Sequence, residues 1–147
     1  MEINLPGAIT PDVKGFLTQV VQWARDASGV EAVALAGSYA RGEAKPSSDI
    51  DLVLLCENPK SFLSRQHWIT AFGKPTKIEK ETWGKVTSLR VWYAQELEVE
   101  FGITSDEWGA DPADQGDGQV IRDGIVVLYE IDSRLSDRVM RFEASLE

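Results

Sequence analysis

The stretch Gly37-Ser38-Tyr39-Ala40-Arg41-Gly42, followed after a short linker by Ser48-Asp49-Ile50-Asp51, decides the fold of this chain. If a helix begins near Gly37, its first backbone N–H groups offer a site for an anion. The two aspartates offer hard oxygen ligands of the kind that Mg²⁺ prefers. A phosphate site beside paired metal ligands predicts chemistry on a nucleoside triphosphate.

Apolar runs on both sides place this motif between two strands. Residues 32–36 (Ala-Val-Ala-Leu-Ala) predict a buried strand, and Gly37 permits a sharp exit from it. Ser38 is expected to be the N-cap of the short helix that follows. Residues 49–56 predict a second strand, on which Asp49 and Asp51 share one face because side chains alternate along a strand.

The motif resembles the signature of the polymerase-β-type nucleotidyltransferases, and most of all that of their minimal, single-domain members. If each fixed letter occurs at about one position in fifteen, the joint pattern arises about once in ten million starts, so a chance match is remote. The resemblance implies an α/β (α+β) fold with helices packed on a mixed β-sheet, like the palm of polymerase β. It also implies an NTP donor, ATP by default, two Mg²⁺ ions and transfer of a nucleoside monophosphate to an acceptor hydroxyl.

The resemblance assigns roles to individual residues of the motif. Asp49 and Asp51 are expected to bind both metal ions, and the backbone at Gly37 is expected to cradle phosphates. The nucleotide-binding set is Gly37, Ser38, Arg41 and Ser48. Arg41, Lys45 and Arg90 are candidates for further phosphate contacts, although surface cations of this kind are common.

A third carboxylate is expected from residues 96–103, where acidic and apolar residues alternate. This alternation predicts a strand with three glutamates on one face. Glu100 is the expected catalytic residue and metal ligand, because Val99-Glu100-Phe101 resembles the apolar-acid-apolar triplet of the family. Glu98, one step back on the same face, is the alternative. A purely solvated acidic face is the other interpretation.

Length and composition predict one nucleotidyltransferase domain over residues 1–147. The chain has no apolar run of eighteen residues and no secretion signal, so we expect a cytoplasmic protein without membrane contact. The lone Cys56 cannot form an intrachain disulfide, and His67 lacks partners for a zinc site. Both residues are expected to be structural.

The net charge of −9 bears on the acceptor. Proteins that bind nucleic acid usually carry basic surfaces, so a nucleic acid acceptor is not expected. A cationic small molecule or a protein fits an acidic surface better. Within the resemblance, a protein acceptor such as a partner toxin is favoured, because drug-modifying members carry an added helical domain.

The remaining elements follow from periodicity and turn residues. A helix begins after Thr10, and a second runs from Asn58-Pro59 through Phe72. Residues 86–93 form an antiparallel hairpin with the glutamate strand. The predictions for the last third of the chain are a loop over 111–117, a hairpin of 119–122 with 125–129 around Asp123-Gly124, and an amphipathic helix at about 133–146, which could dock a partner or form a homodimer.

Three functions follow from these observations. An active nucleotidyltransferase, and by default an adenylyltransferase, is favoured because clustered acids repel one another without a metal. The alternative is a non-catalytic, antitoxin-like module that keeps the fold and binds a nucleotide or a partner. An unrelated α/β domain with an accidental motif is disfavoured by the spacing.

Overall fold

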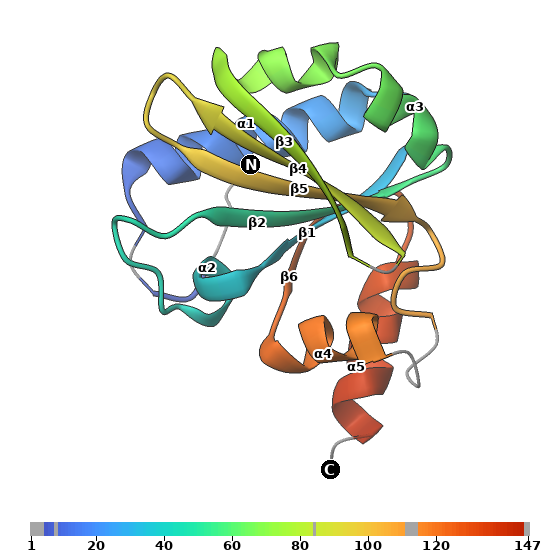
Figure 1. Cartoon of the computed structure of the whole chain (residues 1–147). Helices are drawn as coiled ribbons and strands as arrows, with labels where there is room; N and C mark the ends of the chain where they lie inside the picture. Colours follow the sequence, from blue (N-terminus) through green and yellow to red (C-terminus); the bar gives the residue numbers. More distant parts are fainter. Residues whose placement is uncertain (1–4, 8, 84, 111–114, 146–147) are drawn as a thin grey trace.

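The computed structural model describes residues 5–7, 9–83, 85–110 and 115–145. Within these ranges, six strands form one sheet in the order β3-β4-β5-β2-β1-β6 (Figure 1). The central pair β2 and β5 is parallel, whereas the other neighbours are antiparallel, so the predicted mixed sheet is confirmed. The strands are β1 (Val30–Ala36), β2 (Ile50–Cys56), β3 (Pro75–Trp83), β4 (Val86–Tyr93), β5 (Glu98–Ser105) and β6 (Val126–Glu130). The helices are α1 (Pro11–Asp26), α2 (Gly37–Arg41), α3 (Pro59–Ser64), the 3-10 helix η1 (His67–Phe72), α4 (Gln115–Asp123) and α5 (Arg134–Ser145).

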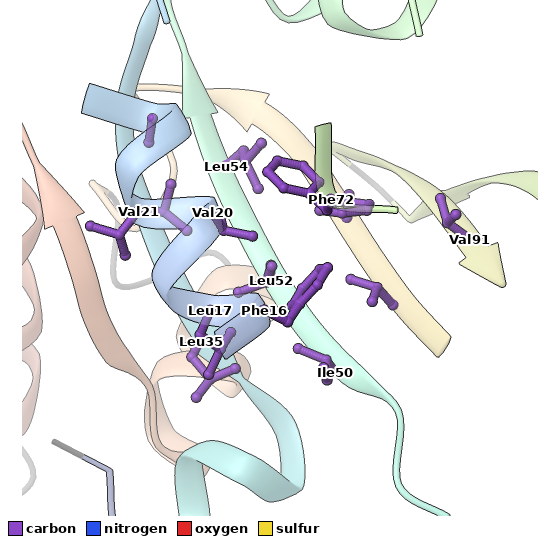
Figure 2. Close-up of a cluster of buried hydrophobic side chains, with 14 of the residues drawn as sticks. Phe16, Leu17, Val20, Val21, Leu35, Ile50, Leu52, Leu54, Phe72 and Val91 are labelled. Atoms are coloured by element: carbon purple, nitrogen blue, oxygen red, sulfur yellow. The ribbon is translucent and has the colours of Figure 1, made fainter. Parts of the chain in front are cut away.

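Helix α1 covers one face of the sheet and closes the main core (Figures 1 and 2). It begins as predicted, since the Thr10 hydroxyl accepts a hydrogen bond from the Val13 N–H at 3.3 Å. The face that α1 buries recurs at three and four residues: Val13, Phe16, Leu17, Val20, Val21 and Ala24. These side chains pack on the residues of β2 and β5 whose side chains point to the α1 side of the sheet, which include Leu52 and Phe101. The α1 side of the sheet is therefore a continuous apolar layer.

The opposite face of the sheet is only partly covered. Helices α4 and α5 lie on this side (Figure 1), and they pack on β1 and β2 through a second cluster. That cluster consists of Ala32, Ala34, Val53, Leu55, Trp108, Ile121, Leu135 and Phe142. Because side chains alternate along β2, Asp51 shares this open face with Val53. The acidic motif therefore faces away from the main core.

For the last third of the chain, the hairpin prediction is wrong and the loop prediction is wrong for its final residues. Residues 119–122 form part of α4 rather than a strand, so the expected hairpin is absent and β6 pairs with β1 instead. Gly124 has φ +113° and its N–H bonds to the carbonyls of Val120 and Ile121, so it ends a helix. The position after a helix and the turn of a hairpin both favour a positive φ, which glycine adopts readily, so Asp123-Gly124 is compatible with either structure. Of the predicted loop, 111–114 lie outside the described residues, and 115–117 belong to α4.

The segment after β2 also differs from its prediction. The expected helix through Phe72 is divided into α3 and η1, with the Trp68 indole donating to the Phe62 carbonyl at 2.9 Å across the break. Strand β3 was not predicted at all. It lies at the edge of the sheet, where one antiparallel ladder to β4 holds it. Its side chains include exposed charges such as Lys77 and Glu79, so the segment lacks the alternation of apolar and polar residues that predicts a strand.

Two further expectations concern Cys56 and membrane-spanning helices. Cys56 is buried at the end of β2 with a free thiol, as expected. Among the described helices, none is both long enough and apolar enough to span a bilayer.

Candidate active site

The sheet brings the three predicted metal-ligating carboxylates together. Asp51 is the direct partner of Glu100 in the parallel ladder of β2 and β5, and Asp49 immediately precedes β2. One carboxylate oxygen from each residue lies within 4.8 Å of the other two. We call Asp49, Asp51 and Glu100 the acidic triad. The proximity of Glu100 to the two aspartates agrees with the expectation that the family resemblance gave for this residue.

Gly37 holds the start of α2 against the acidic triad. A Cβ atom added at Gly37 would lie 2.1 Å from Oδ2 of Asp51, so only glycine allows this approach. Its φ of +69° also disfavours any residue with a side chain. The prediction that Ser38 caps α2 is wrong: Ala36 occupies the cap position without a side-chain bond, and Ser38 lies inside the helix.

Asp51 is the electrostatic centre of the triad. Burial, then the neighbouring charges of Asp49 and Glu100, raise the pKa of Asp51 to about 7, while Arg90 acts in the opposite direction. Its Oδ1 atom is buried, and no hydrogen-bond donor in the described part of the chain reaches it. A buried, unpartnered carboxylate oxygen beside two more carboxylates is the donor set of a hard divalent cation such as Mg²⁺. The residues present therefore fit the metal that the resemblance implies.

Arg90 lies across the acidic triad. It pairs with Glu100 in the β4–β5 ladder, and its Nη2 lies 3.3 Å from Oε2 of Glu100. Its Nη1 donates to Asp49 at 2.9 Å and to Glu98 at 2.6 Å. Glu98 also accepts a bond from the Trp92 indole N–H at 3.0 Å. Glu98 thus binds Arg90 and Trp92, whereas Glu100 joins the triad.

The other predicted nucleotide-binding residues lie around α2 and the loop that follows it. Arg41 is in the last turn of α2, where its Nε lies 3.3 Å from Oε2 of Glu43. The Ser48 hydroxyl accepts a hydrogen bond from the Lys45 N–H at 2.8 Å, which shapes the loop before β2. Ser48 therefore has a visible role in this turn, and its predicted contact with nucleotide stays a prediction.

A cavity of about 730 Å³ adjoins the acidic triad on the open face of the sheet. Its floor is made of small or short side chains of the sheet, including Val53, Ser88 and Gly102. Arg41 and Arg90 also line it, so two members of the triad, Asp51 and Glu100, share this cavity with cationic side chains. The remaining lining residues are Ala36, Gly37, Asp51, Leu52, Lys85, Val86, Glu100, Trp108, Gly116, Asp117, Val120 and Asp123.

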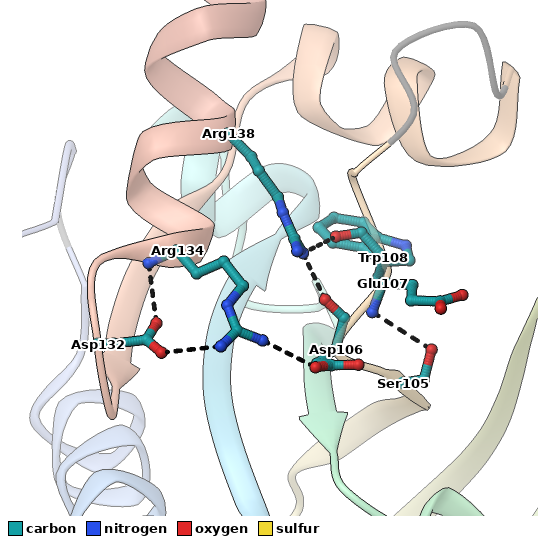
Figure 3. Close-up of polar contacts among 7 residues, drawn as sticks. All are labelled: Ser105, Asp106, Glu107, Trp108, Asp132, Arg134 and Arg138. Carbon is teal, nitrogen blue, oxygen red and sulfur yellow. Dashed lines mark hydrogen bonds and ion pairs between the residues drawn. The ribbon is translucent and has the colours of Figure 1, made fainter.

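The far wall of this cavity consists of residues that the sequence does not predict to belong to the site. Trp108 and α4 form it, and Arg138 of α5 fixes the Trp108 segment by donating to the carbonyls of Asp106 and Trp108, the latter at 3.0 Å (Figure 3). The buried Asp117 carboxylate accepts the Gly109 N–H at 2.8 Å from the other side. No local motif marks Trp108, because its position depends on contacts between segments far apart in sequence.

Comparison with known proteins identifies the family and the fold. A family model described as a nucleotidyltransferase domain matches residues 17–111. The structure of an aminoglycoside 6-adenyltransferase from Bacillus subtilis is similar over 80% of this chain and 41% of its own, with 11% identity and a TM-score of 0.55. At this identity the likeness concerns the fold, and the predicted nucleotidyltransferase fold is confirmed.

Two further solved structures show weaker similarity. The polymerase core of TRAMP, an RNA surveillance complex, has 16% identity and a TM-score of 0.46 over 76% of this chain and 38% of its own. A CCA-adding enzyme has 12% identity and a TM-score of 0.48 over 88% of this chain and 32% of its own. The chain spans less than half the length of each of these three proteins. A search of curated proteins found no match.

Proposed function

This chain belongs to the nucleotidyltransferase domain family, and from that premise we propose that it transfers a nucleoside monophosphate from an NTP to an acceptor hydroxyl. ATP is the first donor to test, and Mg²⁺ is the proposed metal. The observation that carries the proposal is the acidic triad, with Asp51 packed against Gly37 and one buried Asp51 oxygen that no donor among the described residues reaches. Such an arrangement is costly unless a cation uses it.

The proposed roles follow from the position of each group. Two Mg²⁺ ions held by Asp49, Asp51 and Glu100 would supply neutralisation of the charge that develops during transfer. We propose that Glu100 accepts the proton of the acceptor hydroxyl; in support, its side chain lines the cavity beside the triad. The N-terminal backbone of α2 and the Arg41 guanidinium line the side of the cavity where we place the phosphates.

The acceptor is proposed from charge. The chain carries a net charge of −9, and an acidic protein is poorly suited to a phosphate-rich acceptor. We therefore propose a hydroxyl of a protein, such as a partner toxin, or of a cationic small molecule. We also propose that residues 1–147 act as one nucleotidyltransferase unit, since β1, β2 and β5 place the site in the middle of one continuous sheet.

The test is transfer of label from an α-³²P-labelled NTP. The protein, Mg²⁺, each NTP in turn and a cell lysate as acceptor source are incubated, and the labelled products are separated. Labelling by the wild type should be lost in Asp49→Asn and in Glu100→Gln, while Glu98→Gln should keep a measurable part of it. Glu57→Gln is the matched control, because Glu57 lies just beyond the opposite end of β2.

The same experiment distinguishes the alternative function. A wild type that binds Mg-NTP in calorimetry but labels nothing is a non-catalytic, antitoxin-like binding module. A wild type that binds neither Mg²⁺ nor NTP contradicts both the enzyme and the binding module.

A further inference from the structure

Arg90 is placed where a cation would bind the acidic triad. Its guanidinium contacts two of the three triad members, with Nη1 2.9 Å from Asp49 and Nη2 3.3 Å from Glu100. The side chain is 22% exposed, so these contacts are only partly open to water. One guanidinium thus joins a carboxylate of β5 to the carboxylate of Asp49, which immediately precedes β2. It neutralises part of their repulsion when the triad holds no metal.

A residue outside the triad holds Arg90 in this position. The Glu98 carboxylate accepts from Arg90 at 2.6 Å through one oxygen and from the Trp92 indole at 3.0 Å through the other. Both carboxylate oxygens are therefore engaged, and the Trp92 bond fixes the orientation of Glu98. A guanidinium with its several N–H groups can keep the bond to Glu98 while giving up the bonds to the triad.

We propose that Arg90 is an internal counter-ion of the acidic triad that competes with the divalent metal, and that Glu98 retains Arg90 when the metal displaces it. This inference rests on the proposed function, because it takes the triad to be the metal site. Arg90 is then a positioning residue that sets the affinity for the metal. Glu98 acts through Arg90.

A simple structural role for Arg90 predicts a different outcome. If the ion pairs served only to join β4 to β5, loss of Arg90 would weaken the fold and leave metal affinity unchanged or lower. If Arg90 competes with the metal, its loss must raise metal affinity, because a positive charge next to the site disappears. The two hypotheses therefore predict different changes in metal affinity: an increase if Arg90 competes with the metal, and no change or a decrease if its role is only structural.

The test is Mn²⁺ binding by isothermal titration calorimetry, with thermal melting in EDTA and in Mn²⁺. Arg90→Gln should bind Mn²⁺ on the order of tenfold more tightly than the wild type, and should melt at a lower temperature in EDTA. Mn²⁺ should raise its melting temperature by more than that of the wild type. Lys77→Gln is the matched control, because Lys77 is a cation on the neighbouring strand β3 that lies 4.8 Å from the Trp92 ring. It should bind Mn²⁺ like the wild type.

A double-mutant cycle tests the role of Glu98. Glu98→Gln alone should weaken Mn²⁺ binding several-fold, because the displaced guanidinium loses its alternative partner. In the Arg90→Gln background the same change should have little effect, since there is no guanidinium left to retain. An equal effect of Glu98→Gln in both backgrounds would show a direct electrostatic effect and contradict the retaining role.

The remaining outcomes separate this inference from the proposed function. If the wild type binds Mn²⁺ but Arg90→Gln binds it equally or less tightly, the inference is wrong and the metal site stands. If neither the wild type nor any variant binds Mn²⁺, both are wrong.

Discussion

Removal of the Asp51 charge should stabilise the protein when no metal is present. Because each pKa unit corresponds to about 1.4 kcal/mol, the rise in the pKa of Asp51 from 3.8 to about 7 corresponds to about 4 kcal/mol of lost stability at alkaline pH. The site opens on a cavity where water screens part of this charge, so we expect about 2 kcal/mol to be recovered by Asp51→Asn. For a chain of this length, that is a rise in melting temperature of about 4 to 8 °C.

The pH dependence fixes the sign of this prediction. Below the ordinary carboxyl pKa of 3.8, Asp51 is protonated in both the folded and the unfolded state. Between 3.8 and about 7 the unfolded chain releases the proton and the folded protein keeps it. The free energy of unfolding of the wild type therefore falls as the pH rises through this window and becomes level above it. Asp51→Asn lacks this contribution.

The assay is thermal or urea unfolding in EDTA over this pH range, for the wild type and Asp51→Asn. The variant should be more stable at pH 8, and the difference should vanish at the acidic end. Mg²⁺ should stabilise the wild type and not the variant. Glu57→Gln, which removes an exposed acid beyond the far end of β2, controls for the change in net charge. If Asp51→Asn melts at or below the wild-type temperature at pH 8 in EDTA, the repulsion argument is refuted.

Three further substitutions test the backbone and the core. Gly37→Ala should lower the free energy of unfolding by about 2 kcal/mol or more and weaken Mn²⁺ binding, because its Cβ would lie 2.1 Å from Oδ2 of Asp51 at φ +69°; denaturant titration and calorimetry measure the two effects. Gly15→Ala is the converse case, because apart from the neighbouring backbone of α1 no heavy atom of the described residues lies within 4 Å of the added Cβ. It should raise the free energy of unfolding by about 0.5 to 1 kcal/mol in urea titration. Phe16→Ala should cost about 3 to 5 kcal/mol in urea unfolding, because the Phe16 ring is 3% exposed and contacts Phe72 at 5.7 Å between centroids; a loss below 1 kcal/mol would contradict the assigned core.

The elements that could be predicted are those whose own sequence carries a period. The apolar run of β2 and the alternation of acidic and apolar residues in β5 predict the two strands, whereas the family resemblance predicts that Glu100 meets Asp49 and Asp51. Strand β3 has no such period, because an edge strand with charged side chains is held by its backbone ladder to β4. Glycine after α4 could equally have marked a hairpin, so local residues did not decide between the two.

The parts of the site that could not be predicted depend on how distant segments are aligned. Arg90 lies beside Glu100 only because β4 and β5 pair in one particular register, which the turn residue Glu96 at φ +64° helps to set. Trp108 lines the cavity because distant residues hold its segment: Arg138 of α5 bonds its carbonyl, and Asp117 of α4 accepts the following N–H. Neither contact has a signal within its own stretch of sequence.

The register of the two central strands explains why the repulsion in the triad cannot relax by a shift of the backbone. Asp51 and Glu100 are ladder partners, and the residues that follow them, Leu52 and Phe101, are also partners and are buried against α1. A slip of one residue would carry these apolar side chains to the open face and the acids into the core. The repulsion can therefore be relieved only by a proton on Asp51, by the guanidinium of Arg90 or by a bound cation. Core packing on one face of the sheet thus maintains a site on the other face that favours cations.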